Sequence, residues 1–300
     1  VAIGTYSGPG NRDLDFHGKD IIVYSEGQPL LTIIDCGGSP SEHHGGFIFH
    51  SGETLEAIVE GFTIKNAYFA TDGGADTGAI HCDGASPFII GCIISGNTSH
   101  GFTTSGTGLP AVFSCRIINN AGHGVSMGSD MLSSGAANLS QSVIADNKWL
   151  GVSIPWQSDS DRTIMNCTIS GNDSGGVRFI GDPPLACAAS AADTAFTSLY
   201  ANIVAFNGVF GLQRSCCFFP GLQFYCNDVF GNPVDWHNVI DVTSDSAQNF
   251  SADPEFCNAA AGMYELQGSS PCLPGSGNNP CFTMIGALGS GSCVCCVGTL

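Results

Sequence analysis

A five-residue pattern, Asn-x-x-x-Gly, recurs along the chain and limits its possible folds more than any other feature. It occurs at Asn97/Gly101, Asn120/Gly124, Asn147/Gly151, Asn172/Gly176 and Asn207/Gly211. Successive asparagines are 23, 27, 25 and 35 residues apart, and an apolar residue lies three positions before and five positions after each one. A weaker cycle has Asn232 without the glycine. A fixed cycle of this length is typical of repeat proteins.

The cycle predicts short strands that stack directly on one another. It is too short for a β-α-β unit, which needs about thirty residues. Alternate apolar residues such as Cys92 and Ile94 suit one face of a strand. We therefore expect an all-β, single-stranded parallel β-solenoid of roughly 8–10 coils.

The asparagines and glycines of the cycle are both predicted to be turn residues. Asparagine tolerates the left-handed backbone of a turn, and a column of its side chains can hydrogen-bond from coil to coil. Glycine is used where the backbone bends or where there is no room for a Cβ. We therefore expect a structural asparagine ladder from Asn97 to Asn232, with Gly101, Gly124, Gly151, Gly176 and Gly211 as its turn glycines.

We expect the solenoid to occupy residues 1–255 and a capping segment with an apolar, cysteine-rich tail to occupy residues 256–300. The chain has 15 cysteines, which favours an oxidising compartment. Cys92, Cys115 and Cys167 share one inward position of the cycle and are interpreted as small buried hydrophobic residues. Cysteines in the irregular segment are the disulfide candidates, with the connectivity left open: Cys257, Cys272, Cys281 and Cys293.

Charge excludes several classes of partner. The chain has 8 Lys and Arg against 26 Asp and Glu, a net charge of −18. Such a chain cannot neutralise a row of phosphates, so neither nucleic acid nor an anionic membrane surface is expected to bind. No apolar run reaches the length of about 18 residues that spans a membrane, and the first residues have no signal-peptide pattern. We expect a processed, secreted chain.

Several phrases of the sequence resemble one known family. "GTYSGPGNRDLDFHGKDIIVYSEG", "TIIDCGG", "FIFHSGETLEAIVEGFTIKN" and "SADPEFC" followed by "YELQGSSPC" are similar to secreted bacterial right-handed parallel β-helix repeat proteins of the pectin-lyase-like superfamily. The resemblance runs over residues 1–290 and implies a right-handed β-helix. The superfamily includes lyases, hydrolases, adhesins and structural proteins, so the resemblance does not choose among functions.

Two residues are weak catalytic candidates. "AGHGVSMGS" around His123 resembles the Gly-His-Gly motif of galacturonases, which also need aspartates on neighbouring coils and a basic Arg-x-Lys segment. The cycle before His123 has no aspartate, and Arg178 is not followed two residues later by lysine. By the same count, the neighbours of Arg178 on adjacent coils are Ser153 and Gln213. We therefore expect no catalytic residue and interpret His123 as a solvated turn residue.

Calcium is the one cofactor that the sequence leaves open. Carboxylates beside turn carbonyls are suitable ligands for Ca²⁺. They occur in two acidic turns, at Asp72, Asp76 and Asp83 and at Asp159 and Asp161. The alternative is that these turns are simply solvated. Lys148 and Asp173 each follow a ladder asparagine and are expected to form an ion pair between coils.

The leading functional hypothesis is an extracellular, non-catalytic structural protein that assembles end to end with copies of itself, because strand edges at the N-terminal coil are templates for pairing. The first alternative is a carbohydrate-active or carbohydrate-binding β-helix. At least one of Phe224 and Tyr225 should face outward and could belong to a sugar-stacking platform or an interface. The second alternative is an adhesin or passenger fragment of a larger secreted protein.

Overall fold

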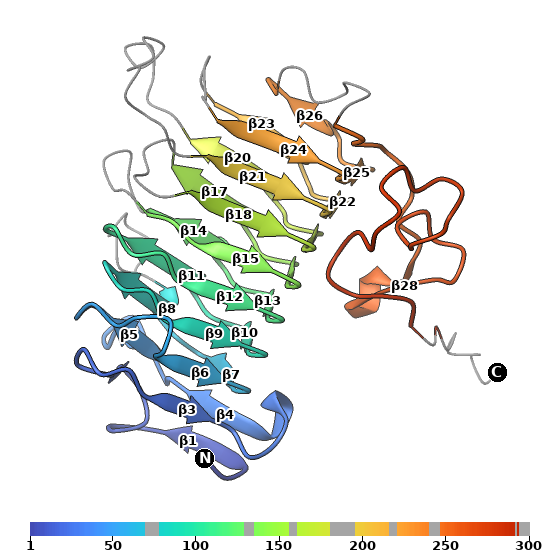
Figure 1. Cartoon of the computed structure of the whole chain (residues 1–300). Helices are drawn as coiled ribbons and strands as arrows, with labels where there is room; N and C mark the ends of the chain where they lie inside the picture. The colour runs from blue at the N-terminus through green and yellow to red at the C-terminus, as the bar shows by residue number, and fades with distance from the viewer. Residues whose placement is uncertain are drawn as a thin grey trace, which may run out of the picture.

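The computed structural model describes residues 1–69, 78–128, 135–155, 161–180, 196–215, 221–239, 247–291 and 293. Three parallel sheets run the length of the stack, and each coil contributes one strand to each sheet in turn (Figure 1). Sheet A contains β1 (Gly4–Ser7), β4 (Thr32–Asp35), β7 (Thr63–Lys65), β10 (Ile93–Ser95), β13 (Arg116–Ile118), β16 (Val143–Ala145), β19 (Thr168–Ser170), β22 (Ile203–Ala205) and β25 (Asp228–Phe230).

Sheets B and C complete each coil. Sheet B contains β2 (Leu14–Asp15), β5 (Phe47–Phe49), β8 (Gly78–Asp83), β11 (His100–Ser105), β14 (Val125–Met127), β17 (Leu150–Pro155), β20 (Gly175–Ile180), β23 (Leu212–Arg214) and β26 (Trp236–His237). Sheet C contains β3 (Ile22–Tyr24), β6 (Ile58–Glu60), β9 (Phe88–Ile90), β12 (Ala111–Phe113), β15 (Asn138–Ser140), β18 (Arg162–Met165), β21 (Thr197–Tyr200) and β24 (Leu222–Tyr225). Among the described residues two sheets have nine strands and the third has eight, and the predicted parallel β-helix is confirmed.

The recurring asparagines lie in one buried column at the turn between sheets A and B. Each Nδ2 donates to Oδ1 of the asparagine on the next coil over 2.9–3.0 Å, from Asn97 through Asn120, Asn147, Asn172 and Asn207 to Asn232. Asn232 then donates to Asp235, which ends the column. The predicted hydrogen bonds from coil to coil are therefore present.

The glycines of the repeat lie at or directly before the start of the sheet B strands, so of the two roles expected for them, a bend and a place without room for a Cβ, the second is the one that all five share. Gly101, Gly151 and Gly176 lie within β11, β17 and β20, whereas Gly124 and Gly211 directly precede β14 and β23. None of the five has a positive φ, so no left-handed turn requires them. They contribute to the fold through the space that they leave at this point of each coil.

Close packing against the next coil explains these glycines. A Cβ at each would press on the apolar side chain that lies three residues before the asparagine of the next coil. At Gly101 the added atom would lie 2.5 Å from Cγ2 of Ile117, and at Gly124 it would lie 2.5 Å from Cγ2 of Ile144. The same contact recurs at Gly151 with Ile169, at Gly176 with Val204 and at Gly211 with Val229.

The left-handed residue of each turn is the one directly before the ladder asparagine, and not the asparagine itself. Its φ lies between 56° and 68° on six successive coils. Two of the six, Asn119 and Asp146, belong to the residue types that tolerate this conformation, and three are glycines. The six residues are Gly96, Asn119, Asp146, Gly171, Phe206 and Gly231.

A second column of side-chain hydrogen bonds lies between sheets C and A. The thiol sulfur of Cys115 accepts the backbone N–H of Cys92 over 3.4 Å, and the hydroxyl of Ser142 accepts the N–H of Cys115 over 3.1 Å. On later coils the side-chain oxygens of Asn202, Asn227 and Asn249 accept the corresponding backbone N–H groups. Cys92, Cys115 and Cys167 are buried as predicted, but reading them as hydrophobic residues alone missed their hydrogen bonds.

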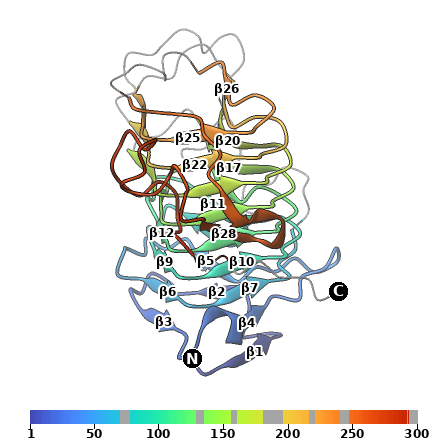
Figure 2. The ribbon, with the colours of Figure 1, turned by 90° about the vertical axis from the view of Figure 1, so that its right-hand side faces the viewer.

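The C-terminal segment folds back against the outer face of sheet A (Figure 2). It contains β27 (Phe256–Asn258), the 3₁₀ turn η2 (Ala259–Ala261) and β28 (Met263–Leu266), and another 3₁₀ turn, η1 (Pro29–Leu31), lies in the first coils. Tyr264, Leu266 and Ile285 pack on Val143 and Ile203 in a second hydrophobic core. No helix among the described residues is long and apolar enough to cross a membrane.

One disulfide joins this segment to the solenoid and a second lies within the segment, and one predicted disulfide candidate is wrong. Cys257 pairs with Cys293, and Cys281 pairs with Cys226 on the solenoid. Cys272 is a buried free thiol that donates to Oδ2 of Asp228 over 3.1 Å. Cys226 has a left-handed backbone with φ of 59° at a corner of its coil, and this position directs it toward the C-terminal segment, away from the solenoid core.

Candidate functional site

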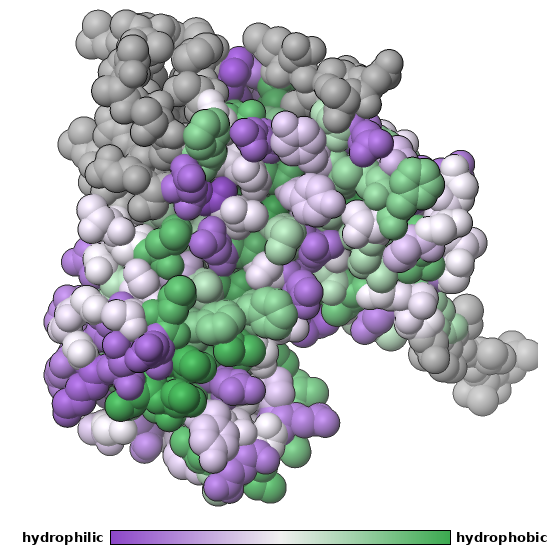
Figure 3. All heavy atoms as spheres, viewed as in Figure 1, coloured by the Kyte–Doolittle hydropathy of each residue, from purple (hydrophilic) through white to green (hydrophobic). Residues whose placement is uncertain are grey.

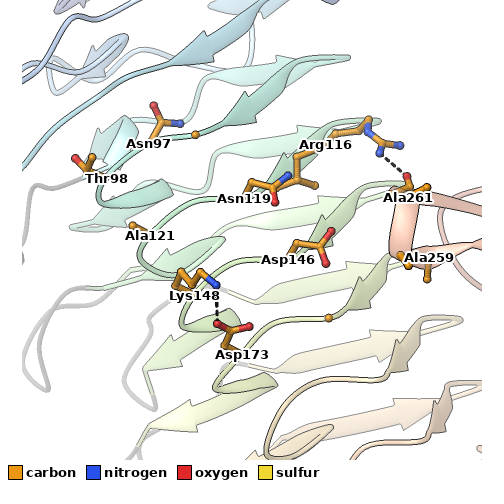
Figure 4. Close-up of a pocket in the computed structure, with 15 residues that line it drawn as sticks. Asn97, Thr98, Arg116, Asn119, Ala121, Asp146, Lys148, Asp173, Ala259 and Ala261 are labelled. Atoms are coloured by element: carbon orange, nitrogen blue, oxygen red, sulfur yellow. Dashed lines mark hydrogen bonds and ion pairs between the residues drawn. The ribbon is translucent and has the colours of Figure 1, made fainter.

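A cleft lies between the C-terminal segment and the turns beside sheet A. We call it the ladder cleft, because it runs beside the asparagine turns of several successive coils (Figure 4). Its volume is about 820 Å³. One wall is η2 with Gly262, and the other comes from turn residues and sheet A, including Thr98, Arg116, Asn119, Asp146, Lys148 and Asp173.

Contacts across the cleft fix its two inner charged side chains. Nη2 of Arg116 donates to the carbonyl oxygen of Gly262 over 2.9 Å. The hydroxyl of Tyr264 donates to Oδ2 of Asp146 over 2.9 Å. Gly171 has φ of +66°, and a Cβ there would lie 2.6 Å from Oδ1 of Asp146, so the glycine leaves room for that oxygen. Burial and the nearby charge of Asp173 raise the pKa of Asp146, against the opposing effect of the Tyr264 hydrogen bond.

The outer rim of the cleft carries an exposed ion pair. Nζ of Lys148 lies 3.0 Å from Oδ2 of Asp173, which confirms the predicted contact between coils. With Arg116 and Asp146, the rim pair gives the cleft two cationic and two anionic groups whose formal charges cancel. All four side chains come from adjacent coils, so the cleft presents donors and acceptors side by side to a ligand.

His100 and His123 each lie three residues after a ladder asparagine, and neither lines the ladder cleft. The rings of His100 and His123 stack with centroids 4.8 Å apart and planes 11° apart, and Trp149 packs edge-on against both. Nδ1 of His123 accepts the N–H of Leu150 over 3.0 Å, and Nδ1 of His100 accepts the N–H of His123 over 2.8 Å. The proton of each neutral ring is therefore on Nε2.

This packing leaves His123 half-buried, whereas the sequence predicted a solvated turn residue. Burial lowers its pKa to about 3, with smaller contributions from His100 and from the positive charge of Arg178. Burial also lowers the pKa of His100 to about 4. Nδ1 is the basic nitrogen of each neutral ring and is already engaged by the backbone, so neither imidazole is placed to accept a proton from a substrate.

Arg178 lies on the outer face of sheet B between Ser153 and Gln213, as the spacing predicted. Its Nε is buried and makes no hydrogen bond among the described residues. The structure thus brings the two weak catalytic candidates into the same electrostatic neighbourhood, since the charge of Arg178 acts on His123. The buried Nε of Arg178 does not donate to His123, and Nδ1 of His123 accepts from Leu150 instead.

Only some of the calcium candidates lie among the described residues. Asp72, Asp76 and Asp159 lie outside the described residues. Asp83 accepts the hydroxyl of Ser105 over 3.0 Å, and Asp161 accepts the N–H of Phe196 over 2.7 Å. Across the described ranges, no group of three or more His, Cys, Asp or Glu side chains could hold a metal ion. Calcium binding stays a prediction.

Sequence reasoning missed the ladder cleft because its two walls are far apart in the chain. Arg116 and Gly262 are separated by 146 residues, and no repeat connects the solenoid to the C-terminal segment. The turn wall does carry a signal, namely the charged residues that directly follow ladder asparagines at Lys148 and Asp173. The opposite wall, "NAAAG" at residues 258–262, has no charged side chain to draw attention to it.

Comparison with known proteins concerns the fold. Residues 20–184 match the sequence family described as "Right handed beta helix region", whereas no curated protein matches the chain. The crystal structure of a mutant of the periplasmic alginate epimerase AlgG is similar with 14% identity and a TM-score of 0.45, covering 77% of this chain and 60% of that one. For AlgG itself the values are 12%, 0.40, 77% and 65%. The chain thus spans less than two thirds of these structures.

Proposed function

Because the chain belongs to the family of right-handed β-helix proteins, in which stacked coils form extended binding surfaces, we propose that it binds carbohydrate in the ladder cleft. The observation that carries this proposal is the cleft of about 820 Å³ with charged groups fixed along its walls. That volume lies within the range of about 300–1,000 Å³ that is usual for ligand sites. It would accommodate a short oligosaccharide.

The chemistry of the lining supports a ligand rich in hydroxyl groups. A sugar hydroxyl both donates and accepts, so it can bridge a carboxylate such as Asp146 and a cation such as Arg116 or Lys148. Hydrogen bonds to charged groups are stronger than those between neutral groups. Since the positive and negative charges of the lining cancel, the cleft has no excess charge to select a phosphate or a cation.

Isothermal titration calorimetry with a panel of short oligosaccharides tests this function, and the chain offers a matched pair of variants. Lys148 and Lys65 each form an ion pair with an aspartate, at 3.0 Å to Asp173 and 3.5 Å to Asp35, but only Lys148 lines the cleft. We expect Lys148→Ala to weaken binding about tenfold, through loss of a charged hydrogen bond, and Lys65→Ala to leave it unchanged. Equal weakening by both variants, or binding of no oligosaccharide, would contradict the proposal.

A second candidate function, end-to-end assembly, has its own support at the first coil. A hollow of about 170 Å³ there is lined by Val1, Tyr6, Leu14, Val23, Ile34, Phe47 and Phe62. Among the described residues β1 pairs with β4 alone and β3 with β6 alone, so one edge of each is a template for another strand. Sedimentation velocity of the full-length natural protein should then show association that depends on concentration and that Ile3→Lys removes, because Ile3 is 61% exposed directly before β1. A single monomeric species at every concentration would refute it.

We also propose that the protein works outside the cytosol. The support is chemical, because disulfides such as Cys226–Cys281 and Cys257–Cys293 form and persist in oxidising compartments such as the cell envelope or the extracellular space. Fractionation of the source cells, followed by thiol labelling of Cys226 and Cys281 without added reductant, tests the location. Labelling of both thiols in freshly prepared protein would contradict it.

A further inference from the structure

Free N–H groups of two histidines form a short row beside the asparagine turns. Nδ1 of His100 and Nδ1 of His123 each accept a backbone N–H, so each neutral ring keeps its proton on Nε2. Neither Nε2 donates to a described residue, and neither is a buried atom without a partner, so both N–H groups reach the surface. The rings are stacked and make the same backbone contact one coil apart, so the two groups point the same way.

Arg178 adds a positive charge two coils beyond His123. Its cross-strand neighbours, Ser153 and Gln213, are neutral. Its guanidinium forms no hydrogen bond or ion pair among the described residues, although the chain has 26 Asp and Glu. Lys148, by contrast, is paired with an aspartate at 3.0 Å. The charge of Arg178 helps to lower the pKa of His123, so the guanidinium and the row of histidines belong to one neighbourhood.

Trp149 lies on the coil between His123 and Arg178 and supplies an apolar surface. Its indole packs edge-on against the rings of His100 and His123 and is 38% exposed. These side chains lie apart from the apolar residues that Figure 3 shows over β6, β9 and β12, which belong to sheet C. We call His100, His123, Trp149 and Arg178 the donor cluster, because each offers an N–H group and none is acidic.

Charge and size together indicate the ligand of the donor cluster. The planar fork of a guanidinium matches a carboxylate, and an exposed indole packs on a flat aromatic ring. The net charge of −18 repels a doubly charged phosphate or sulfate more strongly than a singly charged carboxylate. His123 and Arg178 lie two coils apart, which is about 10 Å along the axis of the solenoid. A ligand of that length reaches from the guanidinium to the histidine N–H groups.

We propose that the donor cluster binds a small, elongated aromatic carboxylate. Its carboxylate pairs with Arg178, its ring packs on Trp149, and an oxygen at its far end accepts from Nε2 of His123 or His100. A metal cation does not suit the cluster, because both free Nε2 atoms carry protons and no carboxylate belongs to it. The site is separate from the ladder cleft, since none of its four residues lines that cleft.

Isothermal titration calorimetry of the intact protein tests this proposal with three matched probes. The anion para-hydroxycinnamate has the carboxylate, the ring and the far oxygen, whereas para-hydroxycinnamamide lacks the charge and cinnamate lacks the far oxygen. We expect para-hydroxycinnamate to bind, and the amide to bind about 10- to 100-fold more weakly through loss of the charged hydrogen bonds to Arg178. Cinnamate should bind about threefold to tenfold more weakly, through loss of one hydrogen bond to a neutral donor.

Two arginine variants locate the bound carboxylate. Arg178→Gln should bind para-hydroxycinnamate about 10- to 100-fold more weakly than the parent protein and should no longer prefer it to the amide. Arg214→Gln is the matched control, because Arg214 on the neighbouring strand β23 also has a buried Nε without a partner. It lies two residues after the core residue Leu212, so it is on the inner side of the sheet, and its variant should bind like the parent protein.

The outcomes separate this site from the ladder cleft and from an inorganic anion site. Lys148→Ala should bind para-hydroxycinnamate like the parent protein even if it loses oligosaccharide binding, so the two proposals can fail independently. Failure of the parent protein to bind para-hydroxycinnamate, equal affinity for the acid and the amide, or equal weakening by both arginine variants would overturn the donor cluster proposal. Tighter binding of inorganic phosphate than of the carboxylate would also overturn it.

Discussion

The outer faces of sheets A and C have similar apolar residues but opposite surroundings. On sheet A, Val143 and Ile203 are almost fully buried, because Tyr264, Leu266 and their neighbours in the C-terminal segment pack on them. On sheet C the outward residues remain accessible from Ile22 to Tyr225. The repeat determines which residues point outward, but it does not determine which outward face the chain itself covers. Among the described residues, the chain therefore covers the outer face of sheet A itself and leaves the outer face of sheet C accessible to solvent.

A matched pair of isoleucine variants tests this difference and should give the largest effect. Ile203 is fully buried on the outer face of sheet A, whereas Ile22 is 60% exposed on sheet C. We expect Ile203→Ala to lower the free energy of unfolding by about 2–5 kcal/mol, because it leaves a cavity under the C-terminal segment. Ile22→Ala should change it by less than about 0.5 kcal/mol. Chemical denaturation measures both, and equal losses would show that the faces do not differ.

Removing the disulfide between Cys226 and Cys281 should loosen the packing of the C-terminal segment on sheet A but should leave sheet C unchanged. Cys226 and Cys281 are 55 residues apart in sequence, and their bond restricts the unfolded chain. We expect Cys226→Ala/Cys281→Ala to lower the free energy of unfolding by about 2–4 kcal/mol. Hydrogen exchange should accelerate in β28 and remain slow in β12. An unchanged denaturation midpoint would contradict this prediction, as would equal acceleration in both strands.

The part of the structure predicted from sequence is the part that repeats. Asn97 and Asn120 share a position because each coil needs the same turn, and a buried turn with one geometry admits few residue types. The spacing located Gly101 and its counterparts but did not decide between their two expected roles, because a glycine that avoids a clash and a glycine that makes a turn look alike in sequence. Contacts between the solenoid and the C-terminal segment have no period at all, so spacing does not encode the pairing of Cys226 with Cys281.

The candidate site was less predictable for the same reason. Counting from the asparagines placed His123 correctly at the turn, but its burial depends on stacking with His100 and on the indole of Trp149. Trp149 occupies a different position of its own cycle from the two histidines, so the count alone does not reveal the contact. Likewise, Arg116 lines a cleft only because the C-terminal segment folds back and places Gly262 beside it.

The covered face also carries a buried carboxyl group that should make its stability depend on pH. Burial raises the pKa of Asp228 from 3.8 to about 7, with Asp235 and Asp253 adding to the effect, while hydrogen bonds from Ala252 and Cys272 oppose it. Between these values the folded chain keeps a proton that the unfolded chain has released. The free energy of unfolding should therefore fall as pH rises from about 4 to about 7 and should level off above about pH 7. The upper limit of this fall is about 1.4 kcal/mol for each unit by which the pKa is raised.

Comparison with Asp228→Asn isolates this contribution. The folded-state pKa values of His100 and His123 are lowered to about 4 and about 3, so their contribution has the opposite sign and is lost as pH falls below the unfolded value of 6.5. Both histidines remain in the variant, and the difference between the two proteins at each pH therefore reports Asp228. Thermal unfolding from pH 4.5 to 7.5 measures that difference. A constant difference across this range would contradict the raised pKa.

The smallest expected effect concerns two ion pairs, one beside the C-terminal segment and one away from it. Lys148 and Asp173 lie at the rim of the ladder cleft, whereas Lys65 and Asp35 lie on the part of sheet A nearer the first coil. The Lys148 and Asp173 side chains are 66% and 54% exposed, so solvent screens their attraction. We expect Lys148→Ala and Lys65→Ala each to lower the free energy of unfolding by less than about 1 kcal/mol, and by less still at high salt. A loss of several kcal/mol for Lys148→Ala alone would mean that this rim is needed to hold the C-terminal segment in place, which would extend the covered face across the cleft.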